Sequence, residues 1–293
     1  MFLYMGKFTY SVNKYEPKQM IALPLALLLV ALCFLGFNML TTGMPVEPGI
    51  DFVGGVAITI LTDETPAQIE AYFAGYPLQS IGESINGGKY LVFDYLDDDT
   101  FRELTGKALA RYPDAMVDQI GETFGKSLQS QAVWALLFSF IGMAIVVFVA
   151  FRLVVPSVAV VLSAFSDIVI TAAFMDVLGI TLSLGTVAAL LMLIGYSVDS
   201  DILLTSKLLK RKGKLEDKLE GAFQTGIIMT TTTLAAVLMM FLVSAIGQVT
   251  IIRDISAVLL IGLLVDLMNT WMLNAGILKN YLAGKGDTRK GGK

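Results

Sequence analysis

Asp176 and Asp266 are two of five acidic residues that lie in or at the edge of stretches otherwise apolar enough to sit inside a membrane. The three that could carry chemistry are Asp167, Asp199 and Asp201. Asp167 belongs to FSDIVIT (165–171), and the other two belong to IGYSVDSDILL (194–204). An ionised Asp at the centre of a membrane helix costs roughly 2.5–3.5 kcal/mol, and no Lys or Arg lies at mid-depth in these apolar stretches. The acids are therefore protonated, or they line a water-filled path, or they pair with a polar group on another subunit. All three arrangements suit proton transfer, and a static polar contact between helices is the simpler alternative.

Proton transfer in this chain has to use carboxylates, hydroxyls and water, because the sequence contains no histidine. The single cysteine, Cys33, cannot form an intrachain disulfide. The sequence also lacks a nucleophile elbow, a phosphate-binding loop and a cluster of metal ligands. We therefore expect no enzymatic activity, no cofactor and no metal site.

The spacing of Asp199 and Asp201 separates them on a helix. Residues two positions apart are rotated by about 200° around the helix axis, so the two side chains cannot share a face. Asp199 stacks with Gly195, whereas Asp201 stacks with Ser197 and Thr205. One acid can therefore face a neighbouring chain while the other faces its own bundle. We rank Asp199 first as a proton-relay residue, followed by Asp201 and Asp167.

A run of four threonines in TGIIMTTTT (225–233) is another polar feature of the apolar stretches. Threonine hydroxyls bond readily to carbonyls of their own helix, which favours a packing role. The alternative is a polar lining beside Asp199, and the sequence does not choose between the two. The candidates for such a lining are Ser197, Thr230, Thr231, Thr232 and Thr233.

The elements that must position these residues are membrane helices. The chain has 293 residues of which 55% are hydrophobic, its mean hydropathy is +0.72, and a membrane span needs roughly 20 apolar residues. We predict a polytopic α-helical membrane protein with six transmembrane helices, the first of them retained rather than cleaved. The predicted spans cover residues 20–41, 128–150, 154–178, 182–205, 224–246 and 253–282.

Most of the 21 Lys and Arg residues fall on one side of the membrane if the N-terminus is cytoplasmic. This predicts a cell-membrane protein with a cytoplasmic segment (1–19), a first helix (20–41), an external domain (42–127), five further helices (128–282) and a cytoplasmic tail (283–293).

The external domain is predicted to be a small α+β unit. Strands and helices are expected in the order β-α-β-β-α-β, the ferredoxin-like arrangement, with a hairpin at INGG. Before it lies PGIDFVGG (48–55), whose glycines suit a rigid joint and whose Asp51 can cap a turn. The predicted elements are a strand at 56–61, a helix at 65–76, strands at 78–83 and 89–95, a helix at 98–112 and a strand at 115–120.

Several motifs together resemble the SecF family, the smaller partner of the SecD–SecF protein-export pair. The resemblance implies membership of the resistance–nodulation–division superfamily, with SecD supplying six further spans. It also implies that the pair works at the Sec channel on a translocating polypeptide, in membrane lipid and without nucleic acid, using the proton gradient. The motifs are GIDFVGG (49–55), IGETFGKSL (120–128), VAFR (149–152), FSDIVIT, IGYSVDSDILL, MTTTTLAA (229–236) and IRDISAVLLIG (252–262), and their structural residues include Gly49, Asp51, Gly54, Gly55, Arg253 and Asp254.

Two departures from the bacterial pattern bring the chain closer to the archaeal branch. Bacterial members read Asn-Asp where this chain has Asp199-Ser200, and they carry an Arg where this chain has Gly226. An acid–Arg proton switch therefore cannot be carried over to this sequence.

Two other functions remain open. The chain can be half of a transporter that exports lipids or small molecules, although such exporters usually carry larger external domains. It can also be a membrane scaffold or chaperone that uses no proton energy, which the missing Arg favours.

Overall fold

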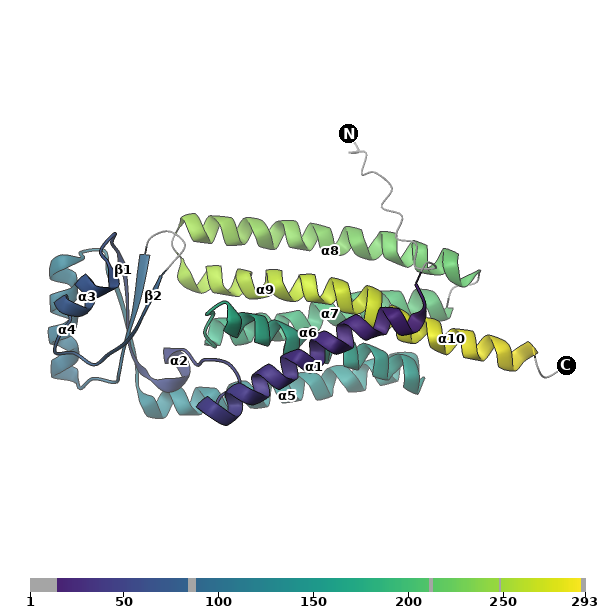
Figure 1. Cartoon of the computed structure of the whole chain (residues 1–293), viewed down its shortest axis with the longest axis horizontal. Coiled ribbons are helices and arrows are strands. Elements are labelled where there is room, and N and C mark those ends of the chain that lie inside the picture. Colours follow the sequence, from purple (N-terminus) through teal and green to yellow (C-terminus); the bar gives the residue numbers. More distant parts are fainter. Residues whose placement is uncertain (1–14, 84–87, 211–212, 248, 291–293) are drawn as a thin grey trace, which may run out of the picture.

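The computed structural model describes residues 15–83, 88–210, 213–247 and 249–290. It is an elongated molecule in which a helical bundle carries a small α/β domain at one end (Figure 1). The predicted hairpin turn at INGG, most of the N-terminal segment and the end of the tail lie outside the described residues. The bundle contains α1 (Pro17–Thr42), α5 (Glu122–Phe151), α6 (Val154–Val177), α7 (Leu184–Lys210), α8 (Leu215–Ile246), α9 (Thr250–Met268), the π-helical segment η2 (Asn269–Asn274) and α10 (Ala275–Lys290).

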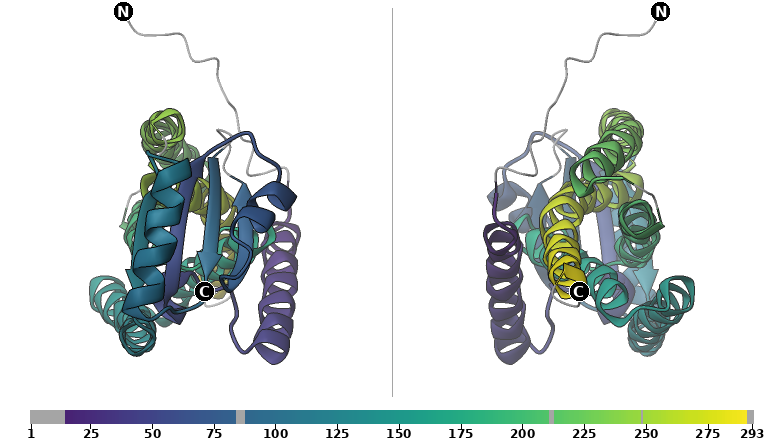
Figure 2. Two further views of the ribbon diagram at one scale, coloured as in Figure 1. Left: turned by 90° about the vertical axis from the view of Figure 1, so that its left-hand side faces the viewer. Right: turned by 90° about the vertical axis from the view of Figure 1, so that its right-hand side faces the viewer.

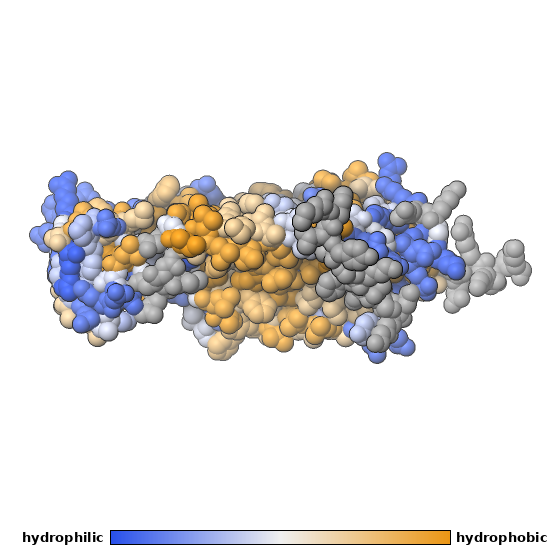
Figure 3. Space-filling model, turned by 90° about the horizontal axis from the view of Figure 1, so that it is seen from above, coloured by the Kyte–Doolittle hydropathy of each residue, from blue (hydrophilic) through white to orange (hydrophobic). Residues whose placement is uncertain are grey.

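Five of the described helices are long and apolar enough to cross a membrane, namely α1, α5, α6, α7 and α8. In their most apolar windows, 67% and 56% of the residues are buried in α6 and α7, against 22%, 11% and 17% in α1, α5 and α8. Helices α6 and α7 therefore lie at the centre of the bundle, whereas α1, α5 and α8 expose most of their apolar side chains. Figure 3 shows the resulting hydrophobic band, with hydrophilic side chains at both ends of the molecule.

The sixth predicted span, residues 253–282, corresponds to a continuous helical run of α9, η2 and α10. Its first part, α9, has 19 residues and includes Arg253, Asp254 and Asp266, and it does not belong to the five apolar helices. A sixth crossing therefore stays a prediction. The π-helical segment is wider than an α-helix, and such segments often occur at functional sites.

Sequence features explain where two of the helices begin and end. A capping box between Glu16 and Gln19, with Pro17 in the first turn, starts α1, and Gly43 ends it in the left-handed conformation. Arg152 ends α5 at a φ of 53°, and α6 begins two residues later. This tight turn makes α5 and α6 antiparallel neighbours.

The α/β domain has one antiparallel sheet in the order β2-β3-β1-β4. Helices α3 (Pro66–Tyr72) and α4 (Asp98–Arg111) cover one face of it, as the left view of Figure 2 shows. The strands are β1 (Gly55–Leu61), β2 (Leu78–Glu83), β3 (Gly88–Phe93) and β4 (Met116–Ile120). The core between sheet and helices follows the alternation of the strands and includes Val56, Ile58, Ile60, Ile69, Phe73, Leu91, Phe93 and Leu104.

The other face of the sheet looks toward the end of the bundle that carries the domain (Figure 1). Tyr90 in β3 is on this face, and burial raises its pKa to about 12, with the charges of Asp51, Asp118 and Asp254 adding to the rise. These carboxylates come from the linker before the sheet, from β4 and from the start of α9. The start of α9 is therefore close enough to this face for its charge to act on Tyr90.

Candidate functional site

Three carboxylates from three helices are buried together inside the bundle. Asp167 comes from α6, Asp201 from α7 and Asp266 from α9, and their relative exposures are 0%, 0% and 2%. We call them, with their hydrogen-bond partners from α7 and η2, the acid cluster. The partners are Ser197, Ser200, Asn269, Thr270 and Asn274.

Asp167 is held by one partner on each oxygen. The hydroxyl of Ser197 donates to Oδ2 at 2.5 Å, and the amide Nδ2 of Asn269 donates to Oδ1 at 2.7 Å. Both carboxyl oxygens of Asp167 therefore act as acceptors in these bonds. Through these two bonds α6 is tied to α7 and to η2.

Asp201 and Asp266 are linked by a single hydroxyl. Oγ1 of Thr270 lies 3.0 Å from Oδ1 of Asp201 and 3.1 Å from Oδ1 of Asp266. Ser200 lies 3.1 Å from Asp266 and 3.1 Å from Thr270, and Nδ2 of Asn274 donates to Asp201 at 2.8 Å. A hydroxyl has one hydrogen, so Thr270 can serve only one of its two carboxylates at a time.

The cluster has more acceptors than donors. Oδ2 of Asp201 and the amide oxygens of Asn269 and Asn274 are buried without a hydrogen-bond partner among the described residues. The ion pairs Arg111–Glu64 and Arg253–Asp254 both lie outside the cluster. Three ionised carboxylates without a counter-charge would cost several kcal/mol each. The arrangement is thus suited to taking up protons and passing them between neighbouring oxygens.

Sequence reasoning found Asp167, Asp201 and Ser197 but missed the contribution of α9 and η2. Asp266 was visible as an acid in an apolar stretch, and its partners follow it at helical spacing in VDLMNTWMLN (265–274). That spacing of one acid, two amides and a hydroxyl was the available signal. The π-helical winding of the segment that carries the partners was not visible in the sequence.

Asp199, the first-ranked candidate, is not part of this cluster. It is exposed on α7, on the same side as Met192, Gly195 and Tyr196, whereas Asp201 is fully buried. The prediction that the two acids face opposite sides is therefore confirmed, because the helix is regular through both. Asp199 lies on a surface that another chain or lipid can reach.

The threonines of α8 bond mainly to their own helix. Thr231 donates to the carbonyl of Ile227 at 2.5 Å, and Thr232 and Thr233 donate to carbonyls one turn back. Only Thr230 of the four is buried. No hydrogen bond within the described residues joins the four to the acid cluster, which agrees with the packing interpretation.

Gly226 is where a tryptophan of η2 approaches α8. A Cβ at this position would collide with the ring of Trp271, which also packs edge-on against Phe223 at a centroid distance of 5.0 Å. A long side chain at position 226 is incompatible with this packing. Position 226 of this bundle therefore has no room for the Arg that the bacterial pattern would place there.

The motif glycines and Asp51 form a joint between the bundle and the α/β domain. The amide of Gly49 donates to the carbonyl of Leu182 at 2.7 Å, and Oδ2 of Asp51 accepts from the amide of Leu184 at 2.8 Å. Gly54 and Gly55 follow with φ values of 84° and 129°, which favour glycine.

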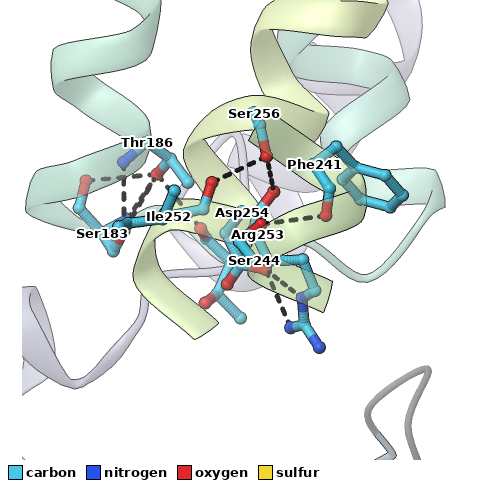
Figure 4. Close-up of polar contacts among 9 residues, drawn as sticks. Ser183, Thr186, Phe241, Ser244, Ile252, Arg253, Asp254 and Ser256 are labelled. Carbon is cyan, nitrogen blue, oxygen red and sulfur yellow. Dashed lines mark hydrogen bonds and ion pairs between the residues drawn. The ribbon is translucent and has the colours of Figure 1, made fainter. Parts of the chain in front are cut away.

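The same end of the bundle carries the Arg253–Asp254 pair at the start of α9. These neighbours are 2.8 Å apart and partly exposed, as the close-up in Figure 4 shows. Ser183 and Thr186 cap the start of α7 with reciprocal bonds nearby. The contacts in this close-up stay local to the helix starts and to the end of α8 (Figure 4).

Comparison with known proteins gives concordant matches. The family model described as "Protein export membrane protein SecD/SecF, C-terminal" matches residues 102–284. A protein-export membrane protein SecF of Methanolacinia petrolearia is 69% identical over 99% of this chain and 100% of its own. The SecF of Haloferax volcanii is 44% identical over 92% of this chain and 94% of its own.

Among solved structures, the chain is similar to the crystal structure of SecDF from Thermus thermophilus, which is described as a translocon-associated membrane protein. The TM-score is 0.75 at 22% identity, so the likeness concerns the fold. The match covers 97% of this chain and 40% of the SecDF chain.

Proposed function

The chain belongs to the SecF family of protein-export membrane proteins, and from this premise we propose that it is an auxiliary, non-enzymatic subunit of Sec-dependent protein export. Relatives that align over nearly their whole length are named protein-export membrane protein SecF. The bundle with one small α/β domain also has the fold of part of SecDF. The chain thus acts on the export of polypeptides rather than on a small substrate.

SecD, the Sec channel and the translocating polypeptide are the proposed partners. The chain accounts for less than half of the matched SecDF chain, which leaves room for a SecD half. The exposed side of α7 supports this pairing, because Asp199 and Tyr196 lie there beside Met192 and Gly195. An acid facing lipid at this depth is costly, and a partner helix would cover it.

The membrane arrangement follows from the same proposal. We place six crossings in the membrane, both termini in the cytoplasm and the α/β domain outside, in membrane lipid that contacts α1, α5 and α8. The order β2-β3-β1-β4 with two helices on one face supports a ferredoxin-like domain. The continuous run of α9, η2 and α10 supports the sixth crossing.

Coupling to the proton gradient is proposed to use Asp201 and Asp167 inside the bundle and Asp199 at the partner surface. The observation that carries this proposal is the acid cluster, whose three carboxylates are buried and connected by hydroxyls with one hydrogen each. A proton that neutralises Asp201 frees the Thr270 hydroxyl to turn toward Asp266. The bonds that hold α7 to α9 and η2 then change with the proton count.

A second candidate is a membrane scaffold or chaperone that uses no gradient. It is favoured by the contact between Gly226 and Trp271, which leaves no room for an Arg at position 226. In that case the acid cluster is a static polar contact between helices.

Reconstitution of the chain with SecD and the Sec channel tests the proposal. Export of a secretory polypeptide is measured with and without a proton gradient, with the chain present or omitted. The auxiliary role predicts that the chain increases export, and coupling predicts that the increase requires the gradient. An increase that ignores the gradient would favour the scaffold, and no increase would contradict the auxiliary role.

A further inference from the structure

Asp51 lies outside the α/β domain and outside the bundle, yet it contacts the first residue of a central helix. Its Oδ2 accepts the backbone N–H of Leu184, at the start of α7, at 2.8 Å. The first N–H groups of a helix have no partner within the helix, and an acceptor with negative charge is favourable there. The cap of α7 is thus supplied partly from the linker, 133 residues earlier in the chain.

Further bonds fix the same linker to the turn before α7. Gly49 donates to the carbonyl of Leu182, and Leu182 donates back to the carbonyl of Glu47, both at 2.7 Å. Glu47 donates to Oδ1 of Asp176, at the end of α6, at 2.9 Å. A side chain on Gly49 would meet the Leu182 carbonyl at 3.1 Å, so the close approach depends on glycine.

The short helix α2 (Ile50–Val53), which contains Asp51, is also packed against the start of α5. A Cβ on Gly125 would lie 2.9 Å from the carbonyl oxygen of Phe52. Three residues after Asp51, at Gly54, the helix ends, and β1 begins at Gly55. Because so few residues separate α2 from β1, a displacement of α2 also displaces β1 in the sheet.

The other end of this connection is the acid cluster. From Leu184 to Asp201, α7 runs without a break, a length of about 25 Å at ~1.5 Å per residue. Ser197, Ser200 and Asp201 of this helix all bond within the cluster. A shift of α7 at the cluster therefore reaches Leu184 as a shift of the whole helix.

We propose that Asp51 is a positioning residue that transmits displacement of α7 from the acid cluster to the α/β domain through its bond to Leu184. The proposal rests on the proposed role of the acid cluster and specifies the route by which it reaches the outer domain. Without this bond, the linker keeps its hydrogen bonds to Leu182 and Asp176 but no longer has the side-chain bond to the first residue of α7.

The test measures distances between spin labels on the full chain in lipid nanodiscs, without gradient, channel or cargo. The labels are attached at Glu103→Cys on α4 and Leu178→Cys at the end of α6, both exposed positions, after Cys33→Ala. Asp201→Asn is introduced as the perturbation of the cluster. In the otherwise unchanged chain it should shift the mean distance, on the order of 1–2 Å as for other helix shifts.

The shift should disappear when Asp51→Ala is added and persist with Asp51→Asn, which keeps an oxygen acceptor. Leu184→Pro provides a second, independent variant, because it removes the donor at a helix position where proline is well tolerated. It should also abolish the shift while leaving Asp51 in place.

Two results would overturn the inference: no shift from Asp201→Asn in the parent chain, or an equal shift with Asp51→Ala and Leu184→Pro. Because the measurement needs no export, it is separate from the test of the proposed function. A chain that does not stimulate export can still show the shift, and a chain that stimulates export can fail to show it.

Discussion

The hydroxyl of Ser197 and the carboxylate of Asp167 are joined by a 2.5 Å hydrogen bond that ties α7 to α6 in the interior of the bundle. Both side chains are fully buried. Asp199, two residues after Ser197, is exposed. One helix therefore offers hydroxyls and an acid to its own bundle and a different acid to its surroundings, which suits a subunit that works with a second membrane chain.

Thr270→Val tests the hydroxyl that Asp201 and Asp266 share. The change keeps the shape of the side chain but leaves buried acceptors without their donor, which typically costs about 1–3 kcal/mol. We expect a less stable chain in thermal unfolding and loss of the gradient-dependent part of export. Thr231→Val is the matched control, because its hydroxyl bonds only to its own helix and is exposed. Equal behaviour of the two variants would show that the shared hydroxyl is unimportant.

Asp199→Asn tests whether the exposed acid acts at a partner surface. Because the side chain is exposed, the stability of the isolated chain should change by less than about 0.5 kcal/mol. In the complex with SecD, the same variant should abolish gradient-driven stimulation of export. Unchanged stimulation in the complex would remove Asp199 from the relay and leave the buried acids as candidates.

Gly226→Arg tests the steric explanation for the missing Arg. The new side chain collides with Trp271, and overpacking of this kind costs about 1–3 kcal/mol or more. Thermal unfolding should show the loss, and Trp271→Ala should restore part of it in the double variant. Gly195→Ala is the control, since a Cβ there meets nothing within 4 Å. A stable Gly226→Arg chain would contradict the packing described here.

Glu64→Gln tests the hydrogen bonds that Glu64 accepts from Arg111 and Tyr112 in the α/β domain. The hydrogen bonds from Arg111 and Tyr112 hold the pKa of Glu64 below its ordinary value of 4.5. Because the folded pKa is lower than the unfolded one, the stabilisation is complete above the ordinary value and is lost as the pH falls through the folded pKa. Wild type should therefore lose stability in acid more steeply than Glu64→Gln, as followed by hydrogen exchange of the domain.

The matched control for this acid dependence is Glu103→Gln, which removes an exposed carboxylate from α4 without touching the contact of Arg111 with Glu64. Equal acid profiles for wild type and Glu64→Gln would show that the Glu64 contact contributes no pH dependence.

Regular periodicity made part of this molecule predictable from sequence. Asp199 and Asp201 were assigned to opposite sides of a helix from their spacing alone, and burial agrees because α7 is regular there. The strands around Ile58 and Leu91 were predicted at 56–61 and 89–95, and both side chains lie in the core of the domain. Where the backbone keeps a single period, the pattern of residues determines the faces.

The remainder depended on features that periodicity does not encode. Asn269, Thr270 and Asn274 share the helical spacing of Asp266, but the π-helical winding of η2, which carries them, left no mark on that spacing. The bond from Asp51 to Leu184 joins residues 133 positions apart, so only the capping tendency of Asp51 was visible in the sequence. The predicted helix at 65–76 ends earlier, at Tyr72, where Phe73 turns into the domain core.

Infrared absorption of protonated carboxyl groups tests the central claim most directly. Because Asp167, Asp201 and Asp266 are buried without a basic partner in the described chain, the account predicts a protonated-carboxyl band at neutral pH in the reconstituted protein. Asp201→Asn should change that band, and Asp176→Asn, at the C-terminal end of α6, should leave it unchanged. The absence of the band at neutral pH, or a band indifferent to substitution of each of the three acids, would contradict a proton-holding cluster.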